Sequence, residues 1–142
     1  MKNRIHAVLI SLGIVVIAVM LYGFAGTEKQ EETSIRTVSG KEFIRAYDTN
    51  SHSRAVLLDV RTPEEFAEGH MEGAINLDIN NPSFKANIGR LDPTNTYFVY
   101  CRSGSRSAQA VKIMKSAGIS SIYELRGGIL SNPETRLVRG DK

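Results

Sequence analysis

The chain has 142 residues, 42% of them hydrophobic, and a formal charge of +3. This length allows one domain with an ordinary core and a short additional segment. Lys2 and Arg4 supply two of the 18 basic residues, and residues 1–26 contain no acidic residue, so the rest of the chain carries 16 basic against 15 acidic residues. That balance gives no indication of a nucleic-acid partner, and we expect none.

Residues 1–26 are predicted to form a signal peptide or an N-terminal membrane anchor. A basic start precedes an uncharged apolar run at residues 7–24, whose length lies between those of a signal-peptide core and a membrane helix. Its length favours an uncleaved anchor, whereas the small residues around Ala25 would suit cleavage, so both remain open. We therefore expect an exported protein at the periplasmic or extracytoplasmic face of the cell membrane, anchored or released.

Residues 27–34 are polar and predict a linker, so the folded domain is expected at residues 35–142. Strands and helices then alternate. The predicted order is a helix from Ser39, a strand at 55–60, a short helix from Pro63, a short strand at 74–77, a helix at 83–90, a strand at 97–100, a helix at 105–117 and a strand at 121–125. This alternation predicts an α/β fold with a parallel sheet and helices on both faces.

The only cysteine, Cys101, follows the apolar strand 97–100 at the expected carboxyl edge of that sheet. Gly104 permits a loop whose backbone N–H groups turn inward, and the next helix adds the positive end of its dipole. Arg102 and Arg106 add full positive charges. These neighbours favour the thiolate, so we expect Cys101 to be a nucleophile for an anionic substrate. An inert buried cysteine is the alternative.

Four motifs occur in one order along the chain: LDVR at 58–61 with Glu65-Phe66 after it, GHMEGAIN at 69–76, CRSGSRS at 101–107 and LRGGI at 125–129. Together they resemble a single-domain rhodanese over about residues 35–130. The resemblance implies a five-stranded parallel sheet flanked by helices and transfer of sulfane sulfur through a cysteine persulfide. It also implies a thiosulfate sulfurtransferase, and we expect no cofactor and no metal.

The resemblance assigns the nucleophile to Cys101 and substrate binding to the loop that follows, namely Arg102, Ser103, Gly104, Ser105 and Arg106. The implied partners are a small anionic sulfur donor and a thiol or cyanide acceptor, and we expect a monomer. One departure concerns the C-terminus. The family commonly has a tryptophan shortly after the paired glycines, but residues 130–133 read Leu-Ser-Asn-Pro, which leaves the packing of that segment open.

Two other functions fit the same loop. Cysteine-dependent phosphatases resemble it but place five residues between cysteine and arginine, whereas four separate Cys101 from Arg106. The loop also contains no carboxylate to protonate a leaving alkoxide, so sulfur transfer is favoured over phosphate transfer. A non-enzymatic carrier or sensor of sulfane sulfur needs the same residues as the enzyme and stays open.

Other polar residues in the motifs are expected to be structural. Asp59 and Arg61 follow a predicted strand and are interpreted as a pair that braces neighbouring loops. His70 follows a glycine at a turn, and only His6 and His52 exist besides it, so the ligand clusters of a metal site are missing.

Overall fold

The computed structural model describes residues 34–50 and 54–138. The predicted signal or anchor segment, residues 1–26, lies outside them, as does nearly all of the predicted linker. Within the described ranges, no helix is long and apolar enough to cross a membrane.

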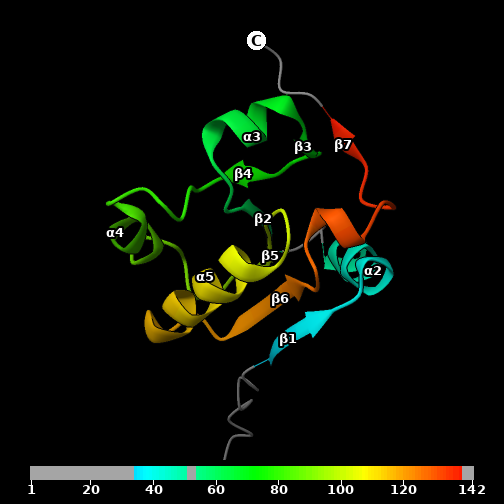
Figure 1. Cartoon of the computed structure of the whole chain (residues 1–142). Coiled ribbons are helices and arrows are strands. Elements are labelled where there is room, and N and C mark those ends of the chain that lie inside the picture. Colours follow the sequence, from blue (N-terminus) through cyan, green and yellow to red (C-terminus); the bar gives the residue numbers. More distant parts are fainter. Residues whose placement is uncertain (1–33, 51–53, 139–142) are drawn as a thin grey trace, which may run out of the picture. The chain divides into compact units, whose positions relative to one another are not determined.

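A five-stranded sheet forms the centre of the domain (Figure 1). Its strands run in the order β1 (Ser34–Val38), β6 (Ser121–Leu125), β5 (Thr96–Tyr100), β2 (Ala55–Asp59) and β4 (Ile75–Asn76). Every neighbouring pair is parallel. A separate antiparallel pair joins β3 (His70–Met71) to β7 (Leu137–Val138). The predicted α/β fold with a five-stranded parallel sheet is confirmed.

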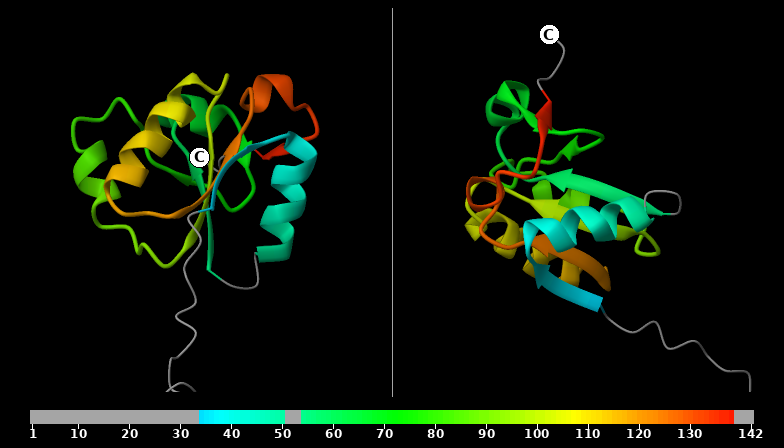
Figure 2. Two further views of the ribbon diagram at one scale, coloured as in Figure 1. Left: turned by 90° about the horizontal axis from the view of Figure 1, so that it is seen from below. Right: turned by 90° about the vertical axis from the view of Figure 1, so that its right-hand side faces the viewer.

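Helices cover both faces of the sheet (Figure 2). α2 (Gly40–Asn50) packs on one face, and α4 (Phe84–Ile88) and α5 (Ser105–Ser116) pack on the other. The central strand β5 is buried on both sides, which explains its continuous apolar sequence. A hydrophobic core lies on each face of the sheet, and alternate residues of β5 belong to different cores. Tyr97 and Val99 lie toward α5, and Phe98 and Tyr100 lie toward α2.

Helix α3 (Pro63–Glu68) begins as the sequence predicts, with a proline in its first turn. Thr62 accepts a hydrogen bond from the backbone N–H of Glu65 at 3.3 Å, and the Glu65 carboxylate accepts one from the N–H of Thr62 at 3.2 Å. This capping box fixes the start of α3 and also the position of the Glu65 side chain.

Strand β1 was not predicted. It begins at Ser34, one residue before the expected start of the domain. The backbone N–H of Ser34 donates to the carbonyl of Ser120 at 2.8 Å. The sequence SIRTV mixes polar and apolar residues, so its strand conformation depends on pairing with β6, which the local sequence does not reveal.

The C-terminal segment, whose packing the sequence leaves open, is held by Asn132. The side-chain amide of Asn132 donates to the carbonyls of Arg126 at 2.8 Å and Gly128 at 2.7 Å, and its oxygen accepts from the N–H of Gly40 at 2.9 Å. Leu130 remains 63% exposed. A buried polar bridge to the start of α2 therefore secures this segment.

Candidate active site

Cys101 lies between the end of β5 and the start of α5, at the carboxyl edge of the parallel sheet. Its side chain is completely buried. Gly104 ends the loop in a left-handed conformation, with φ of +94°, that a residue with a side chain adopts only at a cost. The strand thus fixes the position of the thiol, and the loop turns back over it.

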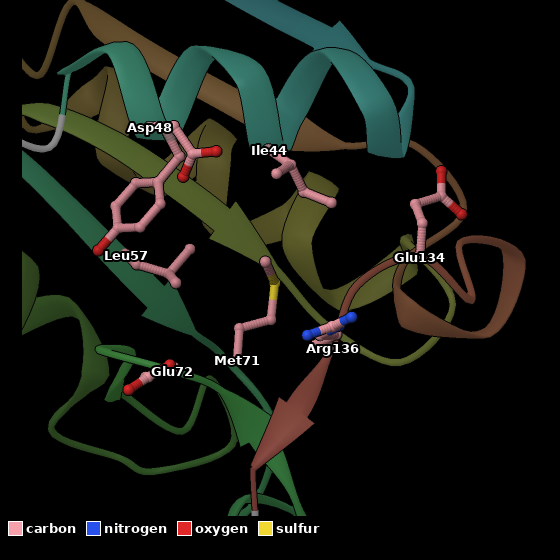
Figure 3. A pocket seen from close by; sticks show the side chains of 8 residues that line it. Ile44, Asp48, Leu57, Met71, Glu72, Glu134 and Arg136 are labelled. Carbon is pink, nitrogen blue, oxygen red and sulfur yellow. The ribbon is translucent and has the colours of Figure 1, made fainter.

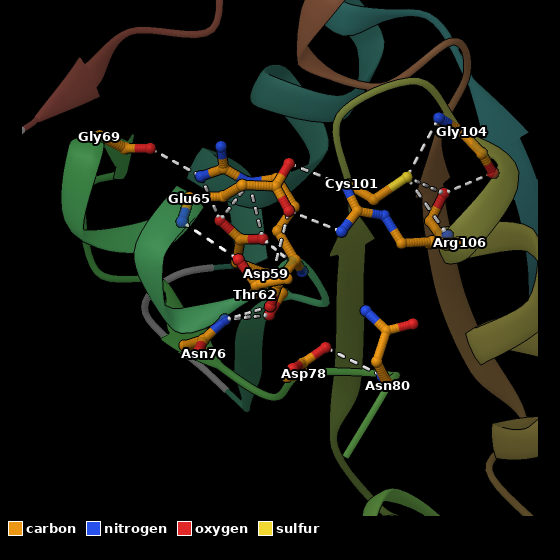
Figure 4. Close-up of polar contacts among 12 residues, drawn as sticks. Asp59, Thr62, Glu65, Gly69, Asn76, Asp78, Asn80, Cys101, Gly104 and Arg106 are labelled. Atoms are coloured by element: carbon orange, nitrogen blue, oxygen red, sulfur yellow. Dashed lines mark hydrogen bonds and ion pairs between the residues drawn. The ribbon is translucent and has the colours of Figure 1, made fainter.

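Two backbone N–H groups point at the sulfur of Cys101 (Figure 4). The nitrogen of Gly104 is 3.1 Å from Sγ and that of Ser107 is 3.4 Å away. The hydroxyl of Ser107 lies 3.6 Å from the same sulfur. Donors held in place by the chain stabilise negative charge without rearranging, so this cradle suits a thiolate or a persulfide anion.

Four of the five loop residues predicted to bind substrate divide into two groups. Gly104 contacts the sulfur directly, whereas Arg102, Ser103 and Ser105 are exposed around it. Ser107, just beyond the predicted set, supplies the second backbone donor. It could have been suspected from its place in the first turn of the helix, where N–H groups lack partners within the helix.

Arg106 forms an ion pair with Glu65 beside the cradle (Figure 4). Its two terminal nitrogens lie 2.6 and 2.8 Å from the two carboxylate oxygens. The hydrogen bonds from Arg106 lower the pKa of Glu65 to about 2, and the same contact raises the pKa of Arg106. The charge of Arg106 is therefore partly balanced by a carboxylate, which holds the guanidinium in one orientation.

Replacing Glu65 by Gln tests this pair through the pH dependence of stability. A carboxyl group whose pKa is lower in the folded chain adds stability that is complete above its unfolded pKa and is lost toward the folded one. We expect the variant to be less stable than the wild type by about 1 kcal/mol at pH 7. Because Glu65 has a folded pKa of about 2, less than half of that difference should remain at pH 3.

Urea denaturation of both proteins from pH 7 to pH 3 measures this difference. Glutamine can still accept the capping hydrogen bond from Thr62, so the comparison isolates the charge. A difference that stays constant down to pH 3 would show that the ion pair does not stabilise the fold.

The paired glycines after β6 support the loop from behind. The N–H of Ile129 donates to the carbonyl of Cys101 at 3.1 Å, and that of Leu130 donates to the carbonyl of Arg102 at 3.0 Å. Gly128 adopts a φ of +60°, and a side chain there would overlap these same carbonyls. Gly128 therefore allows the two loops to make backbone contact, and this contact holds the cradle in position.

Asp59 and Arg61 are the structural pair that the sequence predicts. The guanidinium of Arg61 donates to both carboxylate oxygens of Asp59, at 2.6 to 3.0 Å, and also to the carbonyl of Gly69 at 2.6 Å. Burial lowers the pKa of Arg61, but the hydrogen bond and charge of Asp59 outweigh it and raise the pKa overall. The pair ties the end of β2 to the turn after α3.

His70 has a local partner. Its Nδ1 lies 2.9 Å from the carbonyl oxygen of Phe66, and its ring stacks on that of Phe66 at 3.7 Å. No cluster of three or more potential metal ligands occurs among the residues that the structure describes.

A separate cavity of about 480 Å³ opens beside α2 (Figure 3). It is lined by Ile44, Tyr47, Asp48, Leu57, Met71, Glu72, Glu134 and Arg136. Cys101 is not among these residues. The chemistry of the thiol therefore belongs to the α5 side of the sheet rather than to this cavity.

Glu124 is a second residue near the thiol that the sequence did not single out. Its side chain is only 7% exposed. One carboxylate oxygen lies 2.9 Å from the hydroxyl of Ser107, and the other accepts from the hydroxyl of Thr37 at 2.9 Å. Glutamate is rarely buried, so its occurrence within a largely apolar strand was the sequence feature that could have identified Glu124.

The sequence of this chain is similar to those of several known proteins. The chain is 31% identical over 115 residues to the uncharacterized protein YqhL of Bacillus subtilis (strain 168), covering 81% of this chain and 85% of that protein. It is 33% identical over 72 residues to the thiosulfate sulfurtransferase PspE of Escherichia coli (strain K12), covering 51% of this chain and 68% of that protein.

The fold is similar to that of a rhodanese-related protein from Thermoplasma volcanium. The two structures superpose with a TM-score of 0.60 at 28% identity, over 72% of this chain and 97% of the other. The Rhodanese-like domain family matches residues 40–131, which include the Cys101 loop and both glycines that support it. By this match and by its fold, the chain belongs to the Rhodanese-like domain family.

Proposed function

We propose that this protein is a thiosulfate-type sulfurtransferase that works through a persulfide on Cys101. The thiolate attacks the outer sulfur of thiosulfate, the sulfur–sulfur bond of the donor breaks, and sulfite leaves with the bonding electron pair. The outer sulfur remains on Cys101 as a persulfide. An acceptor such as cyanide or a thiolate then takes this sulfur and regenerates the Cys101 thiolate.

The observation that carries the proposal is the pair of backbone donors on the sulfur. Gly104 and Ser107 direct their N–H groups at Sγ of Cys101 from 3.1 and 3.4 Å. Gly104 is the N-cap of the 12-residue helix α5, and Ser107 lies in its first turn, where the helix dipole favours negative charge. Such a site lowers the energy of the thiolate that attacks and of the persulfide anion that remains.

The active-site loop surrounds the sulfur closely. Cys101 is buried, whereas Arg102, Ser103 and Ser105 of the loop are exposed. The charge of Arg102 would attract the thiosulfate dianion toward the loop. The small size of the cradle suits a single terminal sulfur better than a phosphoryl group.

Parallel assays distinguish this function from the two alternatives. With thiosulfate and cyanide, we expect many thiocyanate molecules per protein and no hydrolysis of an aryl phosphate. A sulfur carrier or sensor would load one sulfur per chain and then stop. Hydrolysis of the aryl phosphate without thiocyanate formation would favour a phosphatase and contradict the proposal.

Replacing Arg106 by Ala is expected to raise the apparent KM for thiosulfate about tenfold, with a smaller effect on kcat. The change removes a positive charge that meets substrate and intermediate about equally. It also leaves Glu65 without its ion-pair partner, and this bare carboxylate repels the donor. The steady-state kinetics of Arg106→Ala and of the double variant with Glu65→Gln separate the two effects, because only the first retains the repulsion. Unchanged kinetics in low salt would contradict a role for Arg106.

We further propose that residues 1–26 export the domain and that it acts as a monomer outside the cytoplasmic membrane. Basic residues before the apolar run favour an N-terminus that stays inside. Protease added to intact spheroplasts should therefore digest the domain while a cytoplasmic marker stays intact. If the domain were protected as well as the marker, export would be excluded.

A further inference from the structure

The second carboxylate near the thiol suggests where the proton of Cys101 goes. We infer that Glu124 is the proton acceptor for Cys101 and receives the proton through the hydroxyl of Ser107. The inference deepens the proposed function, because it concerns the same nucleophile, but its test uses no sulfur donor.

The three side chains form a continuous chain of polar contacts inside the protein. Sγ of Cys101 lies 3.6 Å from Oγ of Ser107, and that oxygen lies 2.9 Å from Oε1 of Glu124. Cys101 and Ser107 have no exposed surface, and Glu124 is 7% exposed. A proton that leaves the thiol therefore meets the Ser107 hydroxyl before it meets bulk water.

The surroundings of Glu124 provide hydrogen bonds without a compensating charge. β1 contributes the hydroxyl of Thr37, which donates to Oε2 at 2.9 Å, and β5 contributes the apolar Val99 in register beside it. In the described part of the chain the ion pairs are Arg61–Asp59 and Arg106–Glu65, and neither includes Glu124. Burying a carboxylate without a cation is costly, so its presence beside a nucleophile points to a chemical use.

Two other charged side chains lie near this row of contacts. Arg106, on α5, interacts electrostatically with Cys101. Arg126, two residues after Glu124, donates to the backbone carbonyl of Thr37 at 2.9 Å. The Ser107 hydroxyl also lies 2.9 Å from the carbonyl of Gly104. Its single proton can therefore be donated to this carbonyl when no proton is passing from Cys101 to Glu124.

The transfer conserves atoms and charge. At the start, the thiol of Cys101 donates to Ser107, and the Ser107 hydroxyl donates to the carboxylate of Glu124. The S–H bond breaks as a new O–H bond forms on Ser107, while the former O–H proton of Ser107 passes to Glu124. At the end, Glu124 is a carboxylic acid that donates to Ser107, and Ser107 donates to the thiolate. The site holds one negative charge throughout, and no redox step occurs.

The backbone donors favour the end state of this relay. The N–H groups of Gly104 and Ser107 stabilise the charge once it has moved to sulfur. Neutralising Glu124 at the same moment avoids two like charges in one buried region. The stored proton stays on Glu124 while the sulfur is loaded and passed on, and it returns to Cys101 when the free enzyme rests.

The pH dependence of alkylation by iodoacetamide tests the relay on the free protein. When two ionisable groups share a proton, protons leave in two steps that describe the pair rather than either residue alone. We expect the alkylation rate of wild-type Cys101 to rise in two steps with pH, and that of Glu124→Gln to rise in one. Ser107→Ala should slow alkylation about tenfold between the two steps, because the thiolate loses a hydrogen-bond donor. The matched control Glu134→Gln, a surface change, should keep both steps.

Infrared spectroscopy reports the proton on Glu124 directly. Between the two steps, the wild type should show the C=O stretch of a buried carboxylic acid, and Glu124→Gln should lack it. Cys101→Ser should also lack this band, because a serine hydroxyl keeps its proton. This second variant provides the same comparison if Glu124→Gln does not fold. A single-step wild-type profile, or a band that persists in Cys101→Ser, would overturn the relay. If thiosulfate fails to load a protein that shows both signatures, the sulfur-transfer proposal fails and the relay stands.

Discussion

Replacing Cys101 by Ser should reduce thiocyanate formation from thiosulfate and cyanide by more than about 10⁴-fold. A serine hydroxyl does not ionise at neutral pH, and an oxygen at this position cannot hold sulfane sulfur as a stable intermediate. The backbone donors of Gly104 and Ser107 remain in place but have no thiolate to stabilise.

The fold should tolerate this change, since serine is smaller than cysteine and the neighbouring N–H groups can still donate to it. We expect the free energy of unfolding to fall by about 1 kcal/mol, measured by urea denaturation. Cys101→Ala provides the control without a hydroxyl and should be equally inactive. Activity of either folded variant near the wild-type rate would show that another group attacks the donor.

The largest expected effect outside the thiol follows from replacing Gly128 by Ala. A Cβ atom at this position would lie 2.6 Å from the carbonyl oxygen of Cys101 and would overlap that of Arg102. Gly128 also has a φ of +60°, which is strained for alanine. Either the turn after β6 or the active-site loop must move. We expect a loss of about 3 kcal/mol in unfolding free energy and more than about 100-fold in kcat/KM.

Gly118→Ala is the matched control for backbone strain. Gly118 has a φ of +87°, but a Cβ atom there would meet nothing within 4 Å. This variant should lose about 1 kcal/mol of stability and retain its kcat/KM. If Gly128→Ala behaved like Gly118→Ala in both measurements, the contact between the two loops would have no role in shaping the cradle.

The inner strands of the sheet and the position of Cys101 could be predicted because their signals are local in the sequence. The apolar runs that became β2 and β5 have the length and composition of strands buried on both faces. Cys101 is the only cysteine and follows one of these runs directly. The predicted start of α3 at Pro63 is confirmed for the same reason, because the capping residues are neighbours in the chain.

What could not be predicted depends on residues that are distant in the sequence. Arg106 was expected to meet the substrate with a full charge, but the fold places Glu65, 41 positions earlier, against its guanidinium. Glu124 contacts Ser107 across 17 positions and Thr37 across 87. No periodicity or spacing in the sequence encodes these pairs, since they arise only when α3, α5, β1 and β6 come together in the fold.

The mass of the intact protein after incubation with thiosulfate tests the central claim most directly. With the reduced protein and no acceptor, we predict an increase of one sulfur atom, located at Cys101 by peptide mapping. Cyanide should remove it and yield one thiocyanate per chain, which distinguishes a persulfide from a sulfenic acid formed by oxidation. If fully reduced protein gains no sulfur from thiosulfate, this chain is not a thiosulfate sulfurtransferase.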